Sequence, residues 1–124
     1  MCTILMSINP EYVDKIIAGN KKYEYRKVKA KKSKVSKIVI YCTSPVMQVV
    51  AEVDVKNIIE AHPDDLWEQT KHFSGVSKEF YDMYYKNRKT AIAYELGEIK
   101  KYEKPKTLEE MGINSIPQSF VYLD

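Results

Sequence analysis

A lysine, a glutamate and an arginine stand close together in the first quarter of this 124-residue chain, at Lys21, Glu24 and Arg26. Glu24 and Arg26 are two positions apart, so both side chains project from one face of an extended strand. A guanidinium there holds the carboxylate ionised and oriented. The pair offers an acceptor to the amino group of a nucleobase and donors to a base carbonyl or a phosphate. Lys21, at the mouth of the strand, adds a mobile cation that could reach phosphate.

The spacing of these three residues leaves two roles open. They could recognise an unstacked or flipped base in a pocket. The other role is structural: a Glu–Arg bridge that closes a β-barrel, with Lys21 solvated.

The three residues lie between a predicted helix and a predicted strand. Residues 2–8 are apolar and rich in β-branched side chains, which predicts a first strand. Residues 10–17 follow as a short helix that Asn9 can cap. Gly19 ends this helix in a left-handed conformation and also lets the backbone approach a ligand closely. Residues 22–28 alternate, so that their tyrosines point away from the face that carries the glutamate and the arginine.

The rest of the chain predicts strands with helices in the connections. Helices are expected over residues 63–70 and 77–86, the second with Phe80, Met83 and Tyr84 on its apolar face. Further strands are expected over residues 37–43, 47–55 (extending toward 59), 90–102, broken or bulged near Gly97, and 118–123. About six strands without β-α-β alternation predict one α+β domain over residues 1–124, a mixed β-barrel with short helices in the crossovers.

Positive charge is concentrated in one part of the chain. Residues 15–37 contain ten Lys or Arg and one acid, a charge of +9, although the whole chain carries only +3. A cationic face of this kind raises the local concentration of polyanions and steers their approach, which favours a nucleic-acid partner. An exposed, solvated hairpin loop would have the same composition. The basic surface is expected to comprise Lys22, Lys27, Lys29, Lys31, Lys32 and Lys34.

Composition and pattern exclude several other classes of protein. The chain has no apolar run long enough to span a bilayer and no secretory signal pattern at its start, so a cytoplasmic location is expected. Cys2 and Cys42 sit in strand-like runs and are expected to be small buried hydrophobes. His62 and His72 form no metal-ligand pattern, and no P-loop or dinucleotide motif occurs. No metal and no cofactor are therefore expected.

The sequence GNKKYEYR at residues 19–26 fits the pattern G-x-K-x-x-E-x-R directly after the predicted helix. This resembles the ASCH family (activating-signal-cointegrator homology domains), a branch of the PUA-like β-barrels. Further segments resemble pieces of the same family and follow in the same order along nearly the whole chain. They are SINP at 7–10, YCTSP at 41–45, LWE at 66–68, KPKTL at 104–108 and PQSF at 117–120. The chain is similar to a small, stand-alone, prokaryotic-type member.

The resemblance implies a PUA-like fold and a ligand cleft lined by the motif. Such relatives generally bind RNA or read modified bases, which implies an RNA or single-strand binding module with a role in transcription or RNA metabolism. Hydroxyl and amide side chains at strand ends are secondary candidates for the cleft, although hydroxyls there often bond the local backbone instead. Tyr41 could stack on a base or belong to the core. The expected ligand-binding residues are Asn9, Gly19, Lys21, Glu24, Arg26, Tyr41, Thr43, Ser44, Gln118 and Ser119.

Other functions stay open beside this one. Some small ASCH proteins that resemble this chain are amidohydrolases that deacetylate N4-acetylcytidine with the motif lysine, a threonine a few residues on and a distant glutamate. Here Lys21 is present, but Glu24 stands where the threonine is expected, which argues against that reaction. Ribonuclease activity has also been attributed to ASCH relatives, and the resemblance then implies Lys21, Glu24 and Arg26 as candidate catalytic residues: cation, general base and oxyanion stabiliser in phosphodiester cleavage. An arginine lowers the pKa of its partner carboxylate, however, which makes that carboxylate a poor base near neutral pH. The remaining alternative is a nucleotide-sensing or protein-interaction domain that uses the same cleft.

Overall fold

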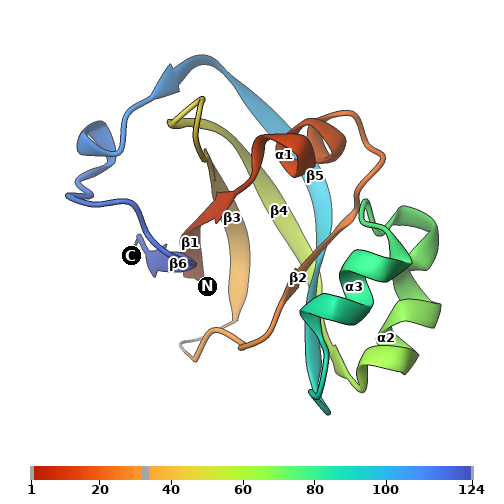
Figure 1. Cartoon of the computed structure of the whole chain (residues 1–124). Helices are drawn as coiled ribbons and strands as arrows, with labels where there is room; N and C mark the ends of the chain where they lie inside the picture. Colours follow the sequence, from red (N-terminus) through yellow and green to blue (C-terminus); the bar gives the residue numbers. More distant parts are fainter. Residues whose placement is uncertain (1, 32–33, 124) are drawn as a thin grey trace.

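The computed structural model describes residues 2–31 and 34–123, and Lys32 of the expected basic surface lies outside them. Six strands form one mixed, curled sheet in the order β2-β5-β4-β3-β1-β6, with short helices against it (Figure 1). The strands are β1 (Cys2–Ile8), β2 (Tyr23–Arg26), β3 (Val35–Cys42), β4 (Gln48–Ala61), β5 (Ala91–Lys106) and β6 (Phe120–Tyr122). The helices are α1 (Pro10–Ile17), α2 (Pro63–Thr70) and α3 (Lys78–Tyr84), with 3₁₀ turns η1 (Lys71–Phe73) and η2 (Glu109–Met111).

The sheet is a half-barrel whose two edge strands are β2 and β6. β1 pairs in parallel with β3, and every other neighbouring pair is antiparallel. β1 and β3 are largely buried on both faces, as their near-continuous apolar sequences require. The expected α+β architecture, a mixed barrel-like sheet with short helices in the crossovers, is confirmed. Its backbone ladder stops short of closure, so β2 and β6 remain separate edges of the described sheet.

The antiparallel pair of β4 and β5 is longer than the sequence predicts. β5 runs through Gly97 without a break, and the expected bulge lies there, because Val55 pairs with Leu96 whereas Val53 pairs with Ile99. A bulge bends its strand and increases the local twist. The irregularities along this pair therefore help to curl the sheet around the core.

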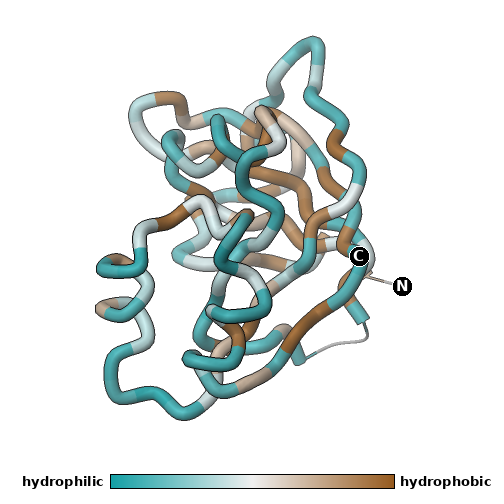
Figure 2. Tube along the Cα trace, turned by 90° about the vertical axis from the view of Figure 1, so that its right-hand side faces the viewer, coloured by the Kyte–Doolittle hydropathy of each residue, from teal (hydrophilic) through white to brown (hydrophobic). Residues whose placement is uncertain are grey.

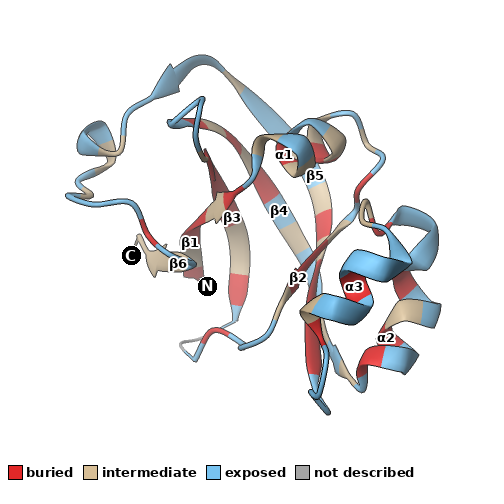
Figure 3. Cartoon of the chain, in the orientation of Figure 1, coloured by how far each residue is buried: buried red, intermediate tan, exposed pale blue. Residues whose placement is uncertain are grey.

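The main core lies between the sheet and α1. Alternate residues of β1 and β3, including Ile4, Met6, Ile38 and Ile40, meet Ile16 of α1 there. A second cluster lies under α2 and α3, and a third packs the C-terminal segment against β1, β3 and β4. Hydrophobic and buried residues accordingly follow the strands, while the connections are polar and exposed (Figures 2 and 3). None of the helices in the described part of the chain is both long and apolar enough to cross a bilayer.

The apolar face predicted for α3 is wrong. Phe80 and Met83 are 47% and 72% exposed, whereas Tyr81 and Tyr85 are buried. The hydroxyl of Tyr81 donates to the Pro63 carbonyl oxygen at 2.8 Å, and the single proton of the Tyr85 hydroxyl is shared between two backbone carbonyl oxygens at 2.9 and 3.0 Å. Because a tyrosine with a satisfied hydroxyl can be buried without losing a hydrogen bond, the two tyrosines occupy the inner face in place of the phenylalanine and methionine.

The ends of two elements also differ from the prediction. Asn9 occupies the N-cap position of α1, but its side chain makes no capping hydrogen bond. Its Oδ1 instead accepts from the Thr43 hydroxyl at 3.2 Å, which ties the helix start to the end of β3. Gly19 has a φ of 84°, as the predicted left-handed helix end requires. β6 is shorter than expected, and Ser119 before it bonds to Ser7 through a single backbone hydrogen bond of 3.0 Å.

Candidate functional site

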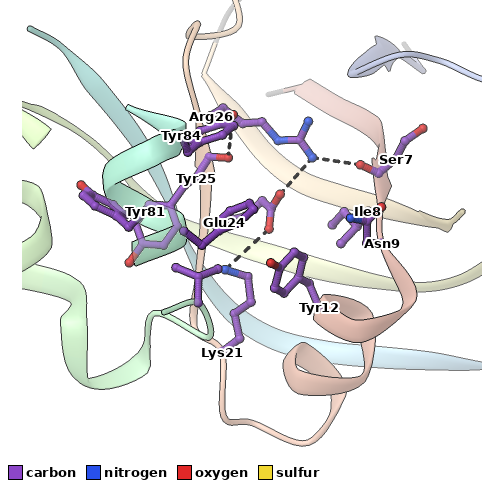
Figure 4. Close-up of a pocket in the computed structure, with 12 residues that line it drawn as sticks. Ser7, Ile8, Asn9, Tyr12, Lys21, Glu24, Tyr25, Arg26, Tyr81 and Tyr84 are labelled. Carbon is purple, nitrogen blue, oxygen red and sulfur yellow. Dashed lines mark hydrogen bonds and ion pairs between the residues drawn. The ribbon is translucent and has the colours of Figure 1, made fainter. Parts of the chain in front are cut away.

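A pocket of about 220 Å³ opens between the end of β1, strand β2 and helix α3 (Figure 4). The carboxylate of Glu24 lies between the side chains of Lys21 and Arg26 on one wall. The pocket is lined by Ser7, Ile8, Asn9, Tyr12, Lys21, Glu24, Tyr25, Arg26, Val76, Phe80, Tyr81 and Tyr84. The fold therefore brings all three charged motif residues into one small, partly aromatic pocket.

Lys21 is a fixed, buried cation, with 2% of the residue exposed. Its Nζ donates a hydrogen bond to the Ser74 carbonyl oxygen at 2.7 Å and lies 3.9 Å from Glu24 Oε1. The same Nζ sits 4.9 Å and 5.5 Å from the ring centroids of Tyr25 and Tyr12. Burial lowers the pKa of Lys21 to about 8, against the opposing effect of the Glu24 charge. The expectation of a mobile, solvated lysine is therefore wrong.

The burial of Lys21 depends on a glycine far along the sequence. Gly75, in the loop before α3, has a φ of 71°, and a β-carbon built there would lie 2.5 Å from Cβ and Cγ of Lys21. A residue without a side chain is needed both for this backbone conformation and for this close approach. The loop before α3 thus covers the lysine because residue 75 is glycine.

Gly75→Ala is expected to destabilise the protein by about 1 to 3 kcal/mol more than Gly112→Ala, because only the first variant adds overpacking to backbone strain. Gly112 is the matched control, since its φ is 77° and nothing lies within 4 Å of a β-carbon there. Urea unfolding of both variants measures the difference. Equal losses of stability would show that the Lys21 stem moves aside without penalty.

Glu24 has one carboxylate oxygen engaged and one available. The residue is 7% exposed. Its Oε2 accepts a hydrogen bond from Arg26 Nη2 at 2.9 Å, whereas Oε1 lies 3.9 Å from Lys21 Nζ, beyond hydrogen-bonding distance. Within the described ranges no group donates a hydrogen bond to Oε1. An ionised carboxylate oxygen that the chain leaves without a donor is a natural acceptor for an N–H group of a ligand.

Arg26 connects the two sides of the opening in the half-barrel. Its Nη2 donates to the Ser7 carbonyl oxygen at 3.0 Å as well as to Glu24, and its Nη1 donates to Ser119 Oγ at 3.2 Å. Ser7 belongs to β1 and Ser119 directly precedes β6, so the guanidinium on β2 reaches from one edge of the sheet to the other. The structural bridge and the base-recognition role considered for this residue involve the same guanidinium.

Aromatic rings form much of the remaining wall. The rings of Phe80 and Tyr84 are nearly parallel, with centroids 6.1 Å apart, and Tyr12 approaches Phe80 at 5.9 Å. Burial raises the pKa of Tyr12 and Tyr84, and it raises that of Tyr25 to about 12. These phenols therefore stay protonated at neutral pH and present flat, uncharged faces beside the charged residues.

Lys21 is expected to make the stability of the protein depend on pH between about 8 and 10.5. Its pKa is about 8 in the folded chain against an ordinary value of 10.5, so the unfolded chain binds more protons in this window. The free energy of unfolding therefore rises with pH there. Relative to Lys21→Met, the wild type should gain about 3 kcal/mol across the window. Urea unfolding at several pH values tests this, and parallel curves for the two proteins would contradict it.

Comparison with known protein families decides the classification. A family model described as the ASCH domain matches residues 6–112. The chain belongs to the ASCH domain family. This family is, in general terms, one of RNA-binding-like domains.

Solved structures share the ASCH fold over nearly the whole chain. The ASCH protein of Zymomonas mobilis superposes with a TM-score of 0.88 at 24% identity, covering 98% of this chain and 87% of that one. A tyrosine-to-phenylalanine variant of the same protein gives 0.89 at 23% identity, covering 100% and 91%. The N-terminal domain of Staphylothermus marinus McrB gives 0.52 at 15% identity, covering 88% and 78%. At these identities the likeness establishes the fold alone.

Two longer proteins of Ureaplasma parvum contain a similar segment. One, named ATP synthase subunit alpha, is 32% identical over 123 residues, which is 98% of this chain and 15% of that protein. The other, named large ribosomal subunit protein uL22, is 33% identical over 91 residues, which is 73% of this chain and 29% of that protein. The chain therefore spans less than a third of either relative.

The ASCH fold brings some of the expected ligand-binding residues to the pocket and leaves others away from it. Asn9 lines the pocket beside the three charged residues. Thr43 and Ser119 do not line it but hold residues that do, since Thr43 bonds to Asn9 and Ser119 to Arg26. Tyr41 is buried in the core cluster shared by β1, β3 and β4. Absent from the pocket lining are Gly19, Ser44 and Gln118.

Sequence reasoning missed the aromatic walls of the pocket. Tyr12 stands one turn into α1, and Phe80, Tyr81 and Tyr84 come from a helix more than fifty residues beyond the motif. The signal available was the count of ten tyrosines, which exceeds what a small core needs. Only the packing of α3 against β2 shows which of them face the pocket.

The expected basic surface divides into two places. Lys22 and Lys27 lie over the rings of Phe73 and Tyr84, at 4.3 and 4.8 Å from their centroids. Three other lysines are exposed around a second depression, of about 400 Å³, which Asn57 and Ile58 of β4 also line. They are Lys29, Lys31 and Lys34.

Proposed function

We propose that this ASCH domain binds RNA or another single-stranded nucleic acid and holds one unpaired base in the pocket at the G-x-K-x-x-E-x-R motif. The observation that carries the proposal is the carboxylate of Glu24 in the pocket wall: the residue is largely buried, and its Oε1 accepts no hydrogen bond from the described chain. An amino group on a base supplies the missing N–H. The general RNA-binding-like character of the family supports the same conclusion.

The pocket has the size and the walls for a single base. A cavity of about 150 Å³ holds benzene, so about 220 Å³ suits a pyrimidine ring with its substituents. Tyr12 and Tyr84 offer flat faces of the kind on which unstacked bases bind. Arg26 uses three of its five N–H groups within the described chain, and its Nε is buried without a partner, so the second N–H of Nη1 is the donor left for a base carbonyl. Cytosine carries an amino group and a carbonyl on one edge and matches this arrangement.

The strand that carries the bound base is expected to contact the basic surface through its phosphates. Residues 15–37 carry a charge of +9, and the exposed lysines among them attract a polyanion irrespective of its sequence. A protein with a similar segment is named for the large ribosomal subunit, which supports an RNA-related role. We propose that the domain acts in transcription or RNA metabolism.

Titration of single-stranded RNA and DNA of one sequence, at two salt concentrations, tests the proposal. Binding is expected to weaken as salt rises, because condensed counterions are released when lysines contact phosphates. A gel of the same samples after incubation reports whether the RNA stays intact, which is the expected result. RNA shortened by the wild type but not by Lys21→Met would assign a ribonuclease instead. Absence of binding to either strand would contradict the proposal.

Neutralising Lys29, Lys31 and Lys34 to glutamine is expected to weaken binding to all sequences alike. The slope of log affinity against log salt should flatten by about 2, since each phosphate contact of a single strand contributes about 0.7. Titrations at several salt concentrations measure this slope. The matched control neutralises three exposed lysines of β5, Lys100, Lys101 and Lys104. If the slope of the first variant is unchanged, these lysines make no contact with phosphates and belong to a solvated loop.

The buried amine of Lys21 favours a second candidate function, hydrolysis of an acylated base such as N4-acetylcytidine. Its pKa of about 8 allows a neutral fraction near physiological pH, and that amine can accept a proton while the oxygen of a water molecule attacks the amide carbonyl. The C–N bond then breaks, the proton passes to the departing base nitrogen, and acetate is released. Because Glu24 stands where the deacetylases are expected to have a threonine, we rank this function below nucleic-acid binding.

Incubation with N4-acetylcytidine, followed by chromatography for cytidine and acetate, tests the second candidate. Lys21→Met should abolish the release, whereas Lys22→Met, which changes an exposed neighbour, should retain it. No release by the wild type would exclude the reaction.

A further inference from the structure

We infer a second nucleotide subsite on the exposed face of α3, directly beside the pocket. The inference rests on the proposed function, because its occupant is the nucleotide that adjoins the pocket base on the same strand. The base of this second nucleotide stacks on Phe80 and Met83, and its phosphate meets Lys27 and Arg88. We call these four residues the α3 platform.

The apolar half of the platform is not needed to hold the helix in place. Tyr81 and Tyr85 already anchor α3 through buried rings and satisfied hydroxyls. Phe80 and Met83, three positions apart on the same helix face, are nevertheless 47% and 72% exposed. The Phe80 ring also lines the pocket and lies nearly parallel to that of Tyr84, so the exposed surface is continuous with the pocket wall. Exposed aromatic faces at the rim of a base pocket are suited to stack a neighbouring base.

The cationic half of the platform identifies a polyanion as the occupant. Lys27 Nζ lies 4.8 Å from the centroid of the Tyr84 ring, and Arg88 Nη2 donates to the Lys27 carbonyl oxygen at 3.1 Å. Neither side chain forms an ion pair with an acid of the described chain. Aromatic rings interleaved with free cations are typical of surfaces that bind single-stranded nucleic acid. An apolar protein partner would have to desolvate both charges without compensation.

The platform also explains how a strand can leave the pocket. Lys27 directly follows Arg26, the last residue of β2, so the platform starts where the pocket wall ends. The chain continues from Lys27 toward the exposed Lys29 and Lys31. Of the two acids on α3, Asp82 is paired with Lys78 at 2.6 Å, whereas Glu79 stands one turn before Met83. The end of the pocket wall, Lys27 of the platform and the exposed lysines of the basic surface thus follow one another along the chain.

Calorimetric titration with cytidine monophosphate and with oligocytidylates of two, three and five nucleotides, at fixed salt, tests the subsite. The wild type should bind the dinucleotide about tenfold more tightly than the mononucleotide. Met83→Glu and Phe80→Ala should bring the ratio of the two affinities close to one. Met83→Glu lies outside the pocket and is exposed, so the helix should still fold, which circular dichroism checks.

The matched control is Phe73→Ala, which removes an exposed phenylalanine (43%) that lines neither the pocket nor the platform. This control should keep the wild-type ratio. Equal affinity of the wild type for mononucleotide and dinucleotide, or an unchanged ratio in both platform variants, would overturn the subsite and leave the pocket proposal standing. Failure of every nucleotide to bind would instead overturn the proposed function and the subsite together.

Discussion

Glu24→Gln is expected to weaken binding of the pocket nucleotide about tenfold to a hundredfold, because a hydrogen bond to a charged acceptor contributes about 1.5 to 3 kcal/mol. The substitution keeps the size of the side chain but removes the negative charge between Lys21 and Arg26. The Glu24 charge raises the pKa of Lys21, so its removal should lower that pKa further. Calorimetry with cytidine monophosphate and a lysine titration by nuclear magnetic resonance measure the two effects.

Glu52→Gln is the matched control for this prediction. Glu52 is also a partly shielded carboxylate, bonded to Lys37 at 2.7 Å and to Tyr102 at 3.0 Å, but it lies outside the pocket. Its substitution should leave nucleotide affinity unchanged. If Glu24→Gln binds nucleotide as tightly as the wild type, the carboxylate serves the Glu–Arg bridge alone and base recognition must come from other atoms.

Arg26→Ala is expected to lower the free energy of unfolding by about 3 kcal/mol and to abolish nucleotide binding. The variant removes three hydrogen bonds and leaves Glu24 buried with Lys21 as its remaining cation. Removing one partner of a buried ion pair costs about 3 to 5 kcal/mol, and the 15% exposure of the Arg26 side chain places the loss at the lower end. Urea unfolding measures the stability, and binding is compared at a temperature where both proteins are folded.

Arg26→Lys separates charge from geometry at this position. A lysine keeps the positive charge beside Glu24 but cannot bond to Ser7, Ser119 and the carboxylate together. Stability should therefore recover in part, while nucleotide binding should not. A loss of less than 1 kcal/mol in Arg26→Ala would show that backbone packing alone holds the edges of the half-barrel.

The local parts of the site could be predicted from the sequence. Period-two alternation on β2 places Glu24 and Arg26 on one face and their tyrosine neighbours on the other, and the 2.9 Å ion pair follows from that spacing. Gly19 and the bulge at Gly97 were recognisable from residue type alone. These features depend on residues only a few positions apart.

The features that could not be predicted depend on contacts between distant segments. Lys21 is shielded from solvent because the loop at Gly75, more than fifty residues further along the sequence, packs over it. The residues next to Lys21 in the sequence give no indication of this contact. The exposed face of α3 was misjudged for a related reason, since tyrosine hydroxyls find carbonyl oxygens on other elements. Hydropathy ranks phenylalanine above tyrosine and takes no account of such acceptors.

The Arg26 bridge has a mechanical consequence for the pocket. Neighbouring strands elsewhere in the sheet are joined by ladders of backbone hydrogen bonds, and separating them breaks many bonds at once. Across the opening between β2 and β1, by contrast, one flexible side chain carries the hydrogen bonds to Ser7 and Ser119. The pocket lies along this opening. We therefore expect a larger or smaller ligand to be accommodated by a change in the width of the opening rather than by a rearrangement of the close-packed hydrophobic core.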